Sequence, residues 1–352
     1  MPTIEPSGNT KVLVSGANGY IAMWVVRTLL EKGFTVRGAV RSAEKGKRLR
    51  EYFQPYGDKV EWVVVEDITK DGAYDEAVKD VDAIEHMASP VTPPTGDPDD
   101  YIKPAVHGTV GILKSAHKFG NRVKRIVVTS SVAAIQGHMI KGSTVTFDES
   151  HWGDEAVEIV KVEGAKAPEM TKYRASKTLA ERAAWDFHKQ YQTKIQWDLV
   201  ALNPPFVFGP SLQELKVPAD LNLSMDVAYQ NLCIDQPDDV LQSTHNYISV
   251  QDIAIAHVAA LSNKAAGGQR IIISEGATTW QETRNLAASL RPDLYASGVL
   301  PRGNPNLPKD LQFIYNNEKG KKIFGFKYKT LEEILIELLA DFEERGWLAK
   351  KD

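Results

Sequence analysis

A tyrosine and a lysine four residues apart could transfer a proton in this chain. Tyr173 and Lys177 stand in the sequence YRASK, and side chains at positions i and i+4 project from one face of a helix. A free tyrosine has a pKa of about 10, but a neighbouring ammonium favours the phenolate and lowers that pKa. The pair predicts a tyrosine that gives a proton to a carbonyl oxygen as hydride reaches the carbonyl carbon. The alternative is a surface pair that adds little to helix stability.

Two serines precede this pair at the end of an apolar strand. Ser130 and Ser131 follow the strand predicted over residues 125–129. Alternation along a strand points the two side chains to opposite faces, so the two are not interchangeable. One hydroxyl could donate a hydrogen bond to the same carbonyl oxygen and stabilise the charge that develops there.

The stretch KVLVSGANGYIA, residues 11–22, has the pattern of strand, glycine turn and helix. Gly16 allows a tight turn, and Gly19 lets the backbone approach a pyrophosphate with no Cβ in the way. The free N–H groups at the helix start would face the negative charge. Ala22 stands at the third small position and still permits close helix–strand packing. The pattern predicts a dinucleotide site, and its alternative is a glycine turn before an ordinary helix.

The end of the second predicted strand distinguishes the two nicotinamide dinucleotides. An NAD site usually has a carboxylate there, whereas this chain has Arg41, followed by Lys45. An arginine fork binds a 2′-phosphate through charge-assisted hydrogen bonds, so the position favours NADP(H) over two solvated surface cations. Asp67, at the end of the third strand, could accept from the adenine amino group or could equally cap the following turn.

An alternating frame of strands and helices must position these side chains. No hairpin signals separate the strands, which predicts an α/β fold with a Rossmann-type, doubly wound parallel sheet. The predicted strands cover residues 12–14, 34–40, 60–65, 83–88, 125–129 and 195–202, with a return to the sheet at 247–250. The predicted helices cover 21–32, 43–53, 73–81, 101–119, 173–190 and 252–261, and residues 138–171 are expected to form a long surface loop with short elements.

The domain organisation follows from this alternation. Residues 1–10 are expected to be a flexible leader, and residues 11–204 an NADP-binding domain to which the chain returns at about 240–275. Residues 205–239 and 276–352 are expected to form a smaller, substrate-binding C-terminal lobe, because proline and irregular patterns replace the alternation there.

Composition excludes several classes of function. The 352 residues carry a net charge of −4, which gives no electrostatic argument for nucleic-acid or membrane binding. A single cysteine, Cys233, excludes an intrachain disulfide and a cysteine-rich zinc site, and no histidine pattern indicates a metal. The N-terminus lacks the layout of a secretory signal, and no apolar run has the length of a membrane span. We therefore expect a cytoplasmic protein, either a monomer or a homodimer.

Taken together, the motifs resemble those of the extended short-chain dehydrogenase/reductases, in particular the fungal aldehyde and methylglyoxal reductases and the plant dihydroflavonol reductases. The similarity covers nearly the whole chain. It includes SGANGYIA (15–22), VRSAEK (40–45), VEDI (65–68), HMASP (86–90), VTSS (128–131), YRASK (173–177), NPPFVFGP (203–210) and YISVQDIA (247–254).

The resemblance implies NADPH-dependent reduction of an aldehyde or ketone by a catalytic triad of Ser131, Tyr173 and Lys177, the second serine of the run being the active one. It also implies a set of cofactor-binding residues: Gly16, Asn18, Gly19, Tyr20, Ile21, Arg41, Lys45, Asp67, Ile68, Ala88, Thr129, Tyr173, Lys177, Pro204, Val207, Gly209, Pro210 and Ser224. The candidates for substrate contact are Ser131, Val91, Phe206 and Met225, and the last two could instead pack the smaller lobe.

Two other functions share this fold. Extended relatives also epimerise or dehydrate nucleotide sugars, but they usually retain NAD and commonly have an acidic residue where this chain has Arg41. A non-catalytic NADP(H)-sensing regulator would tend to lack the tyrosine–lysine pair, which this chain has. Both features favour the reductase.

Overall fold

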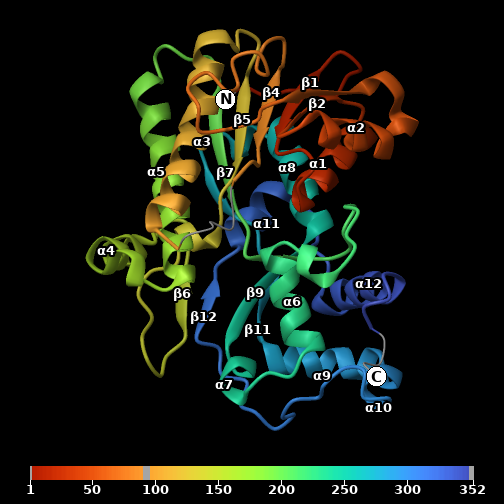
Figure 1. Cartoon of the computed structure of the whole chain (residues 1–352). Helices are drawn as coiled ribbons and strands as arrows, with labels where there is room; N and C mark the ends of the chain where they lie inside the picture. Colours follow the sequence, from red (N-terminus) through yellow and green to blue (C-terminus); the bar gives the residue numbers. More distant parts are fainter. Residues whose placement is uncertain (1, 90–95, 349–352) are drawn as a thin grey trace.

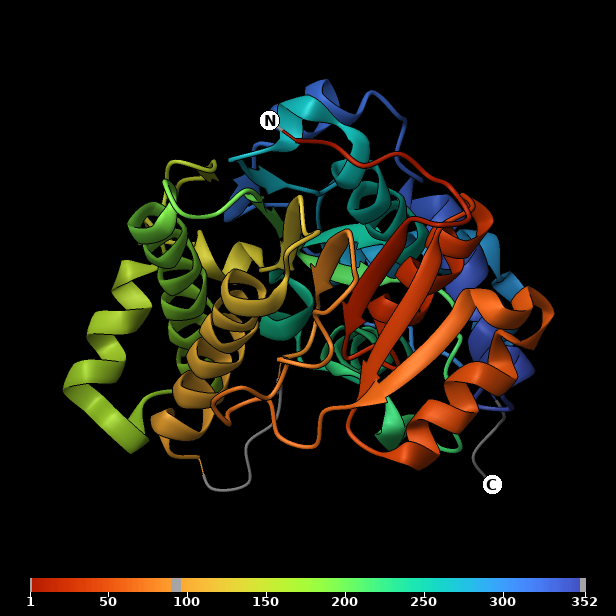
Figure 2. The same ribbon diagram turned by 90° about the horizontal axis from the view of Figure 1, so that it is seen from above.

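The protein is described here by a computed structural model, in which residues 2–89 and 96–348 are placed. Its centre is a seven-stranded parallel sheet with the order β10-β7-β5-β4-β1-β2-β3 (Figures 1 and 2). This confirms the predicted α/β, Rossmann-type fold. The strands are β1 (Lys11–Ser15), β2 (Thr35–Val40), β3 (Val60–Val64), β4 (Ala83–His86), β5 (Arg125–Thr129), β7 (Asp198–Asn203) and β10 (Arg270–Ile272).

Helices cover both faces of this sheet because its strands are apolar on both sides. Along β1, Val12 and Val14 pack in the cluster that includes α1 and α8, while Leu13 packs in the cluster that includes α3 and α5. Figure 2 shows these two layers on either side of the sheet. The helices are α1 (Tyr20–Glu31), α2 (Ala43–Tyr52), α3 (Pro98–Phe119), α5 (Glu169–Tyr191) and α8 (Val250–Ser262).

The strand order reverses beside β1, which pairs with β2 on one side and with β4 on the other. At such a switch point the connections leave the sheet in opposite directions, and a crevice opens at the carboxyl ends of the strands. The glycine turn that follows β1 therefore lies where a dinucleotide binds in open α/β sheets.

A smaller lobe lies below the carboxyl ends of the parallel sheet in Figure 1. Its three-stranded sheet has the order β11-β9-β8, and β12 pairs with β6 in parallel. Its strands are β6 (Val145–Phe147), β8 (Phe206–Phe208), β9 (Thr244–Ser249), β11 (Gly276–Thr279) and β12 (Phe313–Tyr315). The remaining helices are α4 (Asp154–Glu163), α6 (Leu223–Cys233), α7 (Asp238–Leu241), α9 (Trp280–Leu290), α10 (Pro292–Ala296), α11 (Glu318–Phe324) and α12 (Leu331–Glu344).

Two of the predicted elements are wrong. Residues 73–81 form a series of turns rather than a helix, because Gly72 and Asp80 have φ angles of +75° and +58° and interrupt helical backbone at both ends. Of the strand predicted at 247–250, residues 247–249 belong to β9, which pairs with β8 and β11 in the smaller lobe, and Val250 begins α8. The last strand of the parallel sheet is β10 instead.

The other differences concern the ends and the loop. The expected loop at 138–171 contains both α4 and β6, and β6 is stabilised by β12, a partner far away in the sequence. Within the expected flexible leader, Ile4 is buried and its N–H donates to the carbonyl of Leu261, so this residue is anchored to the domain. The helix that carries Tyr173 begins at Glu169, four residues earlier than predicted.

Candidate active site

Two adjoining cavities lie at the carboxyl ends of the parallel strands, on either side of the glycine turn. The first, of about 330 Å³, is lined by the turn, the end of β5, α5, the segment after β7 and the start of α6. The second, of about 230 Å³, is lined by the turn and the ends of β2, β3 and β4. Gly16, Gly19, Met87 and Ser89 border both cavities, so an elongated ligand could occupy the two at once.

The glycine turn is tightly packed against the end of β4. Gly16 has a φ of +63°, and a Cβ at this position would stand 3.1 Å from the Cα of Ala88. Among the described residues, no side chain caps the start of α1, which follows Gly19 directly. A ligand phosphate can approach the bare backbone and the free N–H groups there. The turn thus fits a dinucleotide pyrophosphate, as the sequence predicted.

The second cavity contains the residues expected near the adenosine. Arg41, Lys45 and Ile68 line it together with Ala88 and Asn18. Asp67 does not line it. Its carboxylate accepts hydrogen bonds from the backbone N–H and the hydroxyl of Thr69, at 2.9 and 2.6 Å. These two bonds lower the pKa of the Asp67 carboxyl. The sequence left open whether Asp67 binds the adenine or caps the turn that follows it. The structure favours the second role, because the carboxylate bonds to Thr69 in that turn.

The first cavity brings Ser131, Tyr173 and Lys177 together. Ser131 follows the end of β5, and its hydroxyl donates to the carbonyl of Pro204 at 3.4 Å while lying near enough to Tyr173 to lower the pKa of that phenol. The Nζ of Lys177 lies 5.7 Å from the centre of the Tyr173 ring and donates to Ser89 Oγ at 3.2 Å. Ser130 points to the buried carboxylate of Glu181 instead. The geometry thus agrees with the choice of Ser131 as the serine that lies beside the tyrosine.

Burial determines the protonation of this cluster. It raises the pKa of Tyr173 to about 12, although the nearby hydroxyl of Ser131 works in the opposite direction. The neighbouring lysine led us to predict a lowered pKa for Tyr173, but without a bound ligand the pKa is raised instead. Burial also lowers the pKa of Lys177 to about 8, against the influence of the Glu181 carboxylate. At neutral pH the tyrosine holds its proton and the lysine is an ammonium.

The remaining residues predicted to contact the cofactor divide into two groups. Tyr20, Ile21, Thr129, Pro204, Val207 and Ser224 line the first cavity. Gly209 and Pro210 line neither cavity, and their carbonyls accept from Tyr20 Oη and Trp24 Nε1, at 2.8 and 2.9 Å. These two residues hold the segment after β8 against α1.

The substrate predictions are less well matched. Met225 has no exposed surface and receives a hydrogen bond from Tyr20 Oη through its sulfur, so its assignment to the substrate pocket is corrected to core packing. Phe206 packs against the rings of Phe208 and Trp280 and is not among the residues that line the cavity. Val91 lies outside the described residues.

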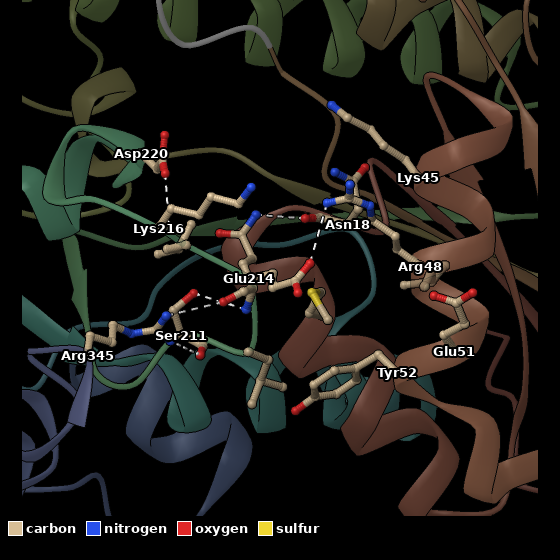
Figure 3. Close-up of a pocket in the computed structure, with 15 residues that line it drawn as sticks. Asn18, Lys45, Arg48, Glu51, Tyr52, Ser211, Glu214, Lys216, Asp220 and Arg345 are labelled. Atoms are coloured by element: carbon tan, nitrogen blue, oxygen red, sulfur yellow. Dashed lines mark hydrogen bonds and ion pairs between the residues drawn. The ribbon is translucent and has the colours of Figure 1, made fainter.

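Gln213 was not among the residues predicted for the site, yet it lines the first cavity from a segment remote in the chain. Its Nε2 donates to the carbonyl of Asn18 in the glycine turn, at 2.8 Å. A further cavity of about 940 Å³ opens on the other side of this segment (Figure 3), where Arg48 from α2 reaches Glu214 at 3.4 Å. Residues 211–216 are thus held against the glycine turn by Gln213 and against α2 by Glu214. No local sequence signal marks this contact, because it depends on how the two lobes pack.

Comparison with known proteins agrees with this geometry. The sequence profile of the NAD dependent epimerase/dehydratase family matches residues 12–274, which include the glycine turn and the Tyr173–Lys177 pair. The chain belongs to this family. The resemblance to extended short-chain dehydrogenase/reductases is thereby confirmed.

Individual relatives match over almost their whole length. The chain is 34% identical to the NADPH-dependent methylglyoxal reductase of Saccharomyces cerevisiae over 92% of this chain and 95% of that protein. It is 36% identical to a ketoreductase of Aspergillus niger over 96% and 98% of the two chains. The crystal structure of yeast methylglyoxal/isovaleraldehyde reductase complexed with NADPH superimposes with a TM-score of 0.83 at 31% identity, over 96% of this chain and 100% of that one.

Two further observations bear on ligands and membranes. Among residues 2–89 and 96–348, no group of three or more histidine, cysteine or acidic side chains is arranged to hold a metal ion. Within the same ranges, no helix combines the length and the apolar character that a membrane span requires.

Proposed function

We propose that this protein is an NADPH-dependent carbonyl reductase acting on an aldehyde or ketone. The observation that carries the proposal is the cluster of Ser131, Tyr173 and Lys177 in one cavity, directly beside a glycine turn with an uncapped helix start. The relatives described as an NADPH-dependent methylglyoxal reductase and a ketoreductase support the same reaction class.

The residues of the second cavity support NADPH as the cofactor. Arg41 and Lys45 would bind the 2′-phosphate, because both line this cavity and neither forms an ion pair with another of the described residues. Gly16 and Gly19 would hold the pyrophosphate against the start of α1. When bound, the nicotinamide supplies the hydride that is added to the carbonyl carbon.

The catalytic cluster would supply the proton. Ser131 would donate a hydrogen bond to the carbonyl oxygen and hold it beside the Tyr173 hydroxyl. Tyr173 would act as the acid, because its raised pKa keeps it protonated at neutral pH. Lys177 would stabilise the phenolate that remains, since an ammonium close to the ring lowers the free energy of that anion.

A nucleotide-sugar epimerase or dehydratase is the second candidate, because the family profile carries that name. Arg41 argues against it, since NAD-retaining relatives commonly have an acidic residue at this position. A non-catalytic NADP(H) sensor is disfavoured by the tyrosine–lysine pair that lines the first cavity, because a binding protein does not need it.

The proposal is tested by following NADPH and NADH oxidation in parallel by absorbance, against a panel of aldehydes, ketones and diketones. We expect oxidation of NADPH that depends on the carbonyl compound, with NADH used less well. Binding of NADPH without reduction of any carbonyl compound would overturn the reductase and direct attention to nucleotide sugars.

A further inference from the structure

Helix α5 carries a third functional side chain in line with the tyrosine and the lysine. Glu181 follows Lys177 by four residues, so Tyr173, Lys177 and Glu181 form a row on one face of the helix. The Glu181 carboxylate is only 2% exposed. Burying a carboxylate costs free energy of folding unless the group is paired and hydrogen-bonded. The partners of Glu181 therefore matter for its role behind the active site.

We propose that Glu181 is a positioning residue that fixes the backbone of Ser131 and keeps Lys177 in its ammonium form. The proposal rests on the proposed reductase function, because that function gives Ser131 and Lys177 their roles. Glu181 itself lines neither of the two cavities expected to hold the cofactor and the substrate.

One carboxylate oxygen holds the serine segment. Glu181 Oε2 accepts from Ser130 Oγ at 2.5 Å and from Asn203 Nδ2 at 2.8 Å. The same Asn203 amide donates to the carbonyl of Ser131 at 3.0 Å. The residue before Ser131 is therefore held by Glu181 directly, and the carbonyl of Ser131 is held by Glu181 through Asn203, so the carboxylate fixes the backbone from which the Ser131 hydroxyl enters the first cavity.

The other oxygen holds a partly buried arginine. Glu181 Oε1 accepts from Arg270 Nε at 2.5 Å and from Trp185 Nε1 at 3.2 Å. The Arg270 guanidinium also donates to the carbonyls of Glu149 and His151 and lies 3.5 Å above the ring of Trp152. Arg270 is therefore held between Glu181 and the segment that contains Glu149, His151 and Trp152. With four donors the carboxylate is held as an anion at a defined position.

The charge of this anion reaches Lys177 across a small polar cavity. A space of about 20 Å³ is lined by both Lys177 and Glu181, together with Ser89, Ser130 and His86. The titratable groups that face Lys177 are Tyr173 and Glu181 on its own helix and His86 on β4. Burial and the Lys177 charge lower the pKa of His86 to about 3, so this ring is neutral. Glu181 is thus the anion that counteracts the desolvation of Lys177.

The test is Glu181→Gln, which keeps the shape of the side chain and removes its charge. Without the carboxylate, the pKa of Lys177 should fall below its wild-type value of about 8, because burial is no longer opposed. Protein labelled with carbon-13 at the lysine Cε gives this pKa directly by NMR in the ligand-free state, with Lys177→Arg used to assign the signal. In the assay of carbonyl-dependent NADPH oxidation, the alkaline fall of kcat should move to lower pH by the same amount.

Ser130→Ala is the matched control, because it removes a hydrogen bond from the same carboxylate and leaves the charge in place. We expect a lower kcat with the pH profile unmoved. If Glu181→Gln does not fold, the double variant Glu181→Gln/Arg270→Gln avoids an unpaired, largely desolvated arginine. It should shift the titration in the same direction but by less, because a positive charge is lost together with the carboxylate.

An unchanged Lys177 titration in folded Glu181→Gln or in the double variant would overturn the proposal, as would an equal shift in Ser130→Ala. The two proposals can fail separately. If the wild-type protein reduces no carbonyl compound, the reductase function is wrong, and the lysine titration alone then decides whether Glu181 sets the charge of Lys177.

Discussion

The tight contact beneath the glycine turn leads to a prediction about Gly16→Ala. A residue with a side chain in the left-handed region costs roughly 1–2 kcal/mol of stability. Gly16 has a φ of +63°, so this cost applies to Gly16→Ala. The substitution also causes a steric clash, because the new Cβ would stand 3.1 Å from the Cα of Ala88 and 3.3 Å from its Cβ. Backbone atoms cannot rotate away, so the turn and the end of β4 must separate by a few tenths of an ångström.

This displacement should weaken cofactor binding. Gly16 and Ala88 both line the cavity expected to hold the adenosine, so their separation changes the positions of several groups at once. We expect the Kd for NADPH to rise about tenfold, which corresponds to about 1.4 kcal/mol. The Kd is measured by titration of NADPH fluorescence, and stability by the midpoint of urea unfolding.

Gly325→Ala is the matched control for this variant. Gly325 has a similar φ of +71° at the end of α11, and a Cβ there would meet no described atom within 4 Å. It should lose stability through the same backbone strain and keep the wild-type Kd. The reasoning is refuted if Gly16→Ala binds NADPH as tightly as the wild type, or if Gly325→Ala weakens binding equally.

Three other predictions concern the catalytic cluster and the choice of cofactor. Tyr173→Phe should lower kcat by roughly 10²–10⁴-fold through loss of the acid while NADPH still binds, and a fully active variant would remove Tyr173 from this role. Arg41→Glu should raise the Kd for NADPH far more than that for NADH, because a carboxylate repels the 2′-phosphate; equal effects would show that Arg41 does not contact this group. The kcat of the wild type should fall as the pH rises through about 8, since the lowered pKa of Lys177 means that its ammonium is lost there, and a constant rate up to pH 10 would contradict this assignment.

Local patterns determined the framework of the site. The glycine turn, the helical spacing of Tyr173 and Lys177, and the apolar strands each depend on residues that are neighbours in the chain, so their geometry could be predicted from residue types alone. The parallel sheet followed from the alternation of these elements. Arg41 was placed correctly at the cavity because it directly follows a strand whose neighbours in the sheet were also predicted.

Tertiary packing decided what these patterns left open. Residues 73–81 have a helical pattern, yet backbone turns at both ends override it. Met225 is apolar and near the site in sequence, but only the position of α1 shows that it lies under Tyr20 rather than in the cavity. Gln213 and Asn18 meet although 195 residues separate them.

The sequence by itself therefore determined which chemical groups this protein brings to its site, and the tertiary structure decided how they are charged and held. Tyr173 illustrates the difference. Its lysine neighbour predicts a lowered pKa, but the surrounding protein removes water from the hydroxyl and raises that pKa instead. Desolvation depends on every atom packed around a group, and many of those atoms come from other segments, such as Ser131 after β5 and Pro204 after β7 in the cavity of Tyr173. Such an environment exists only once the chain has folded.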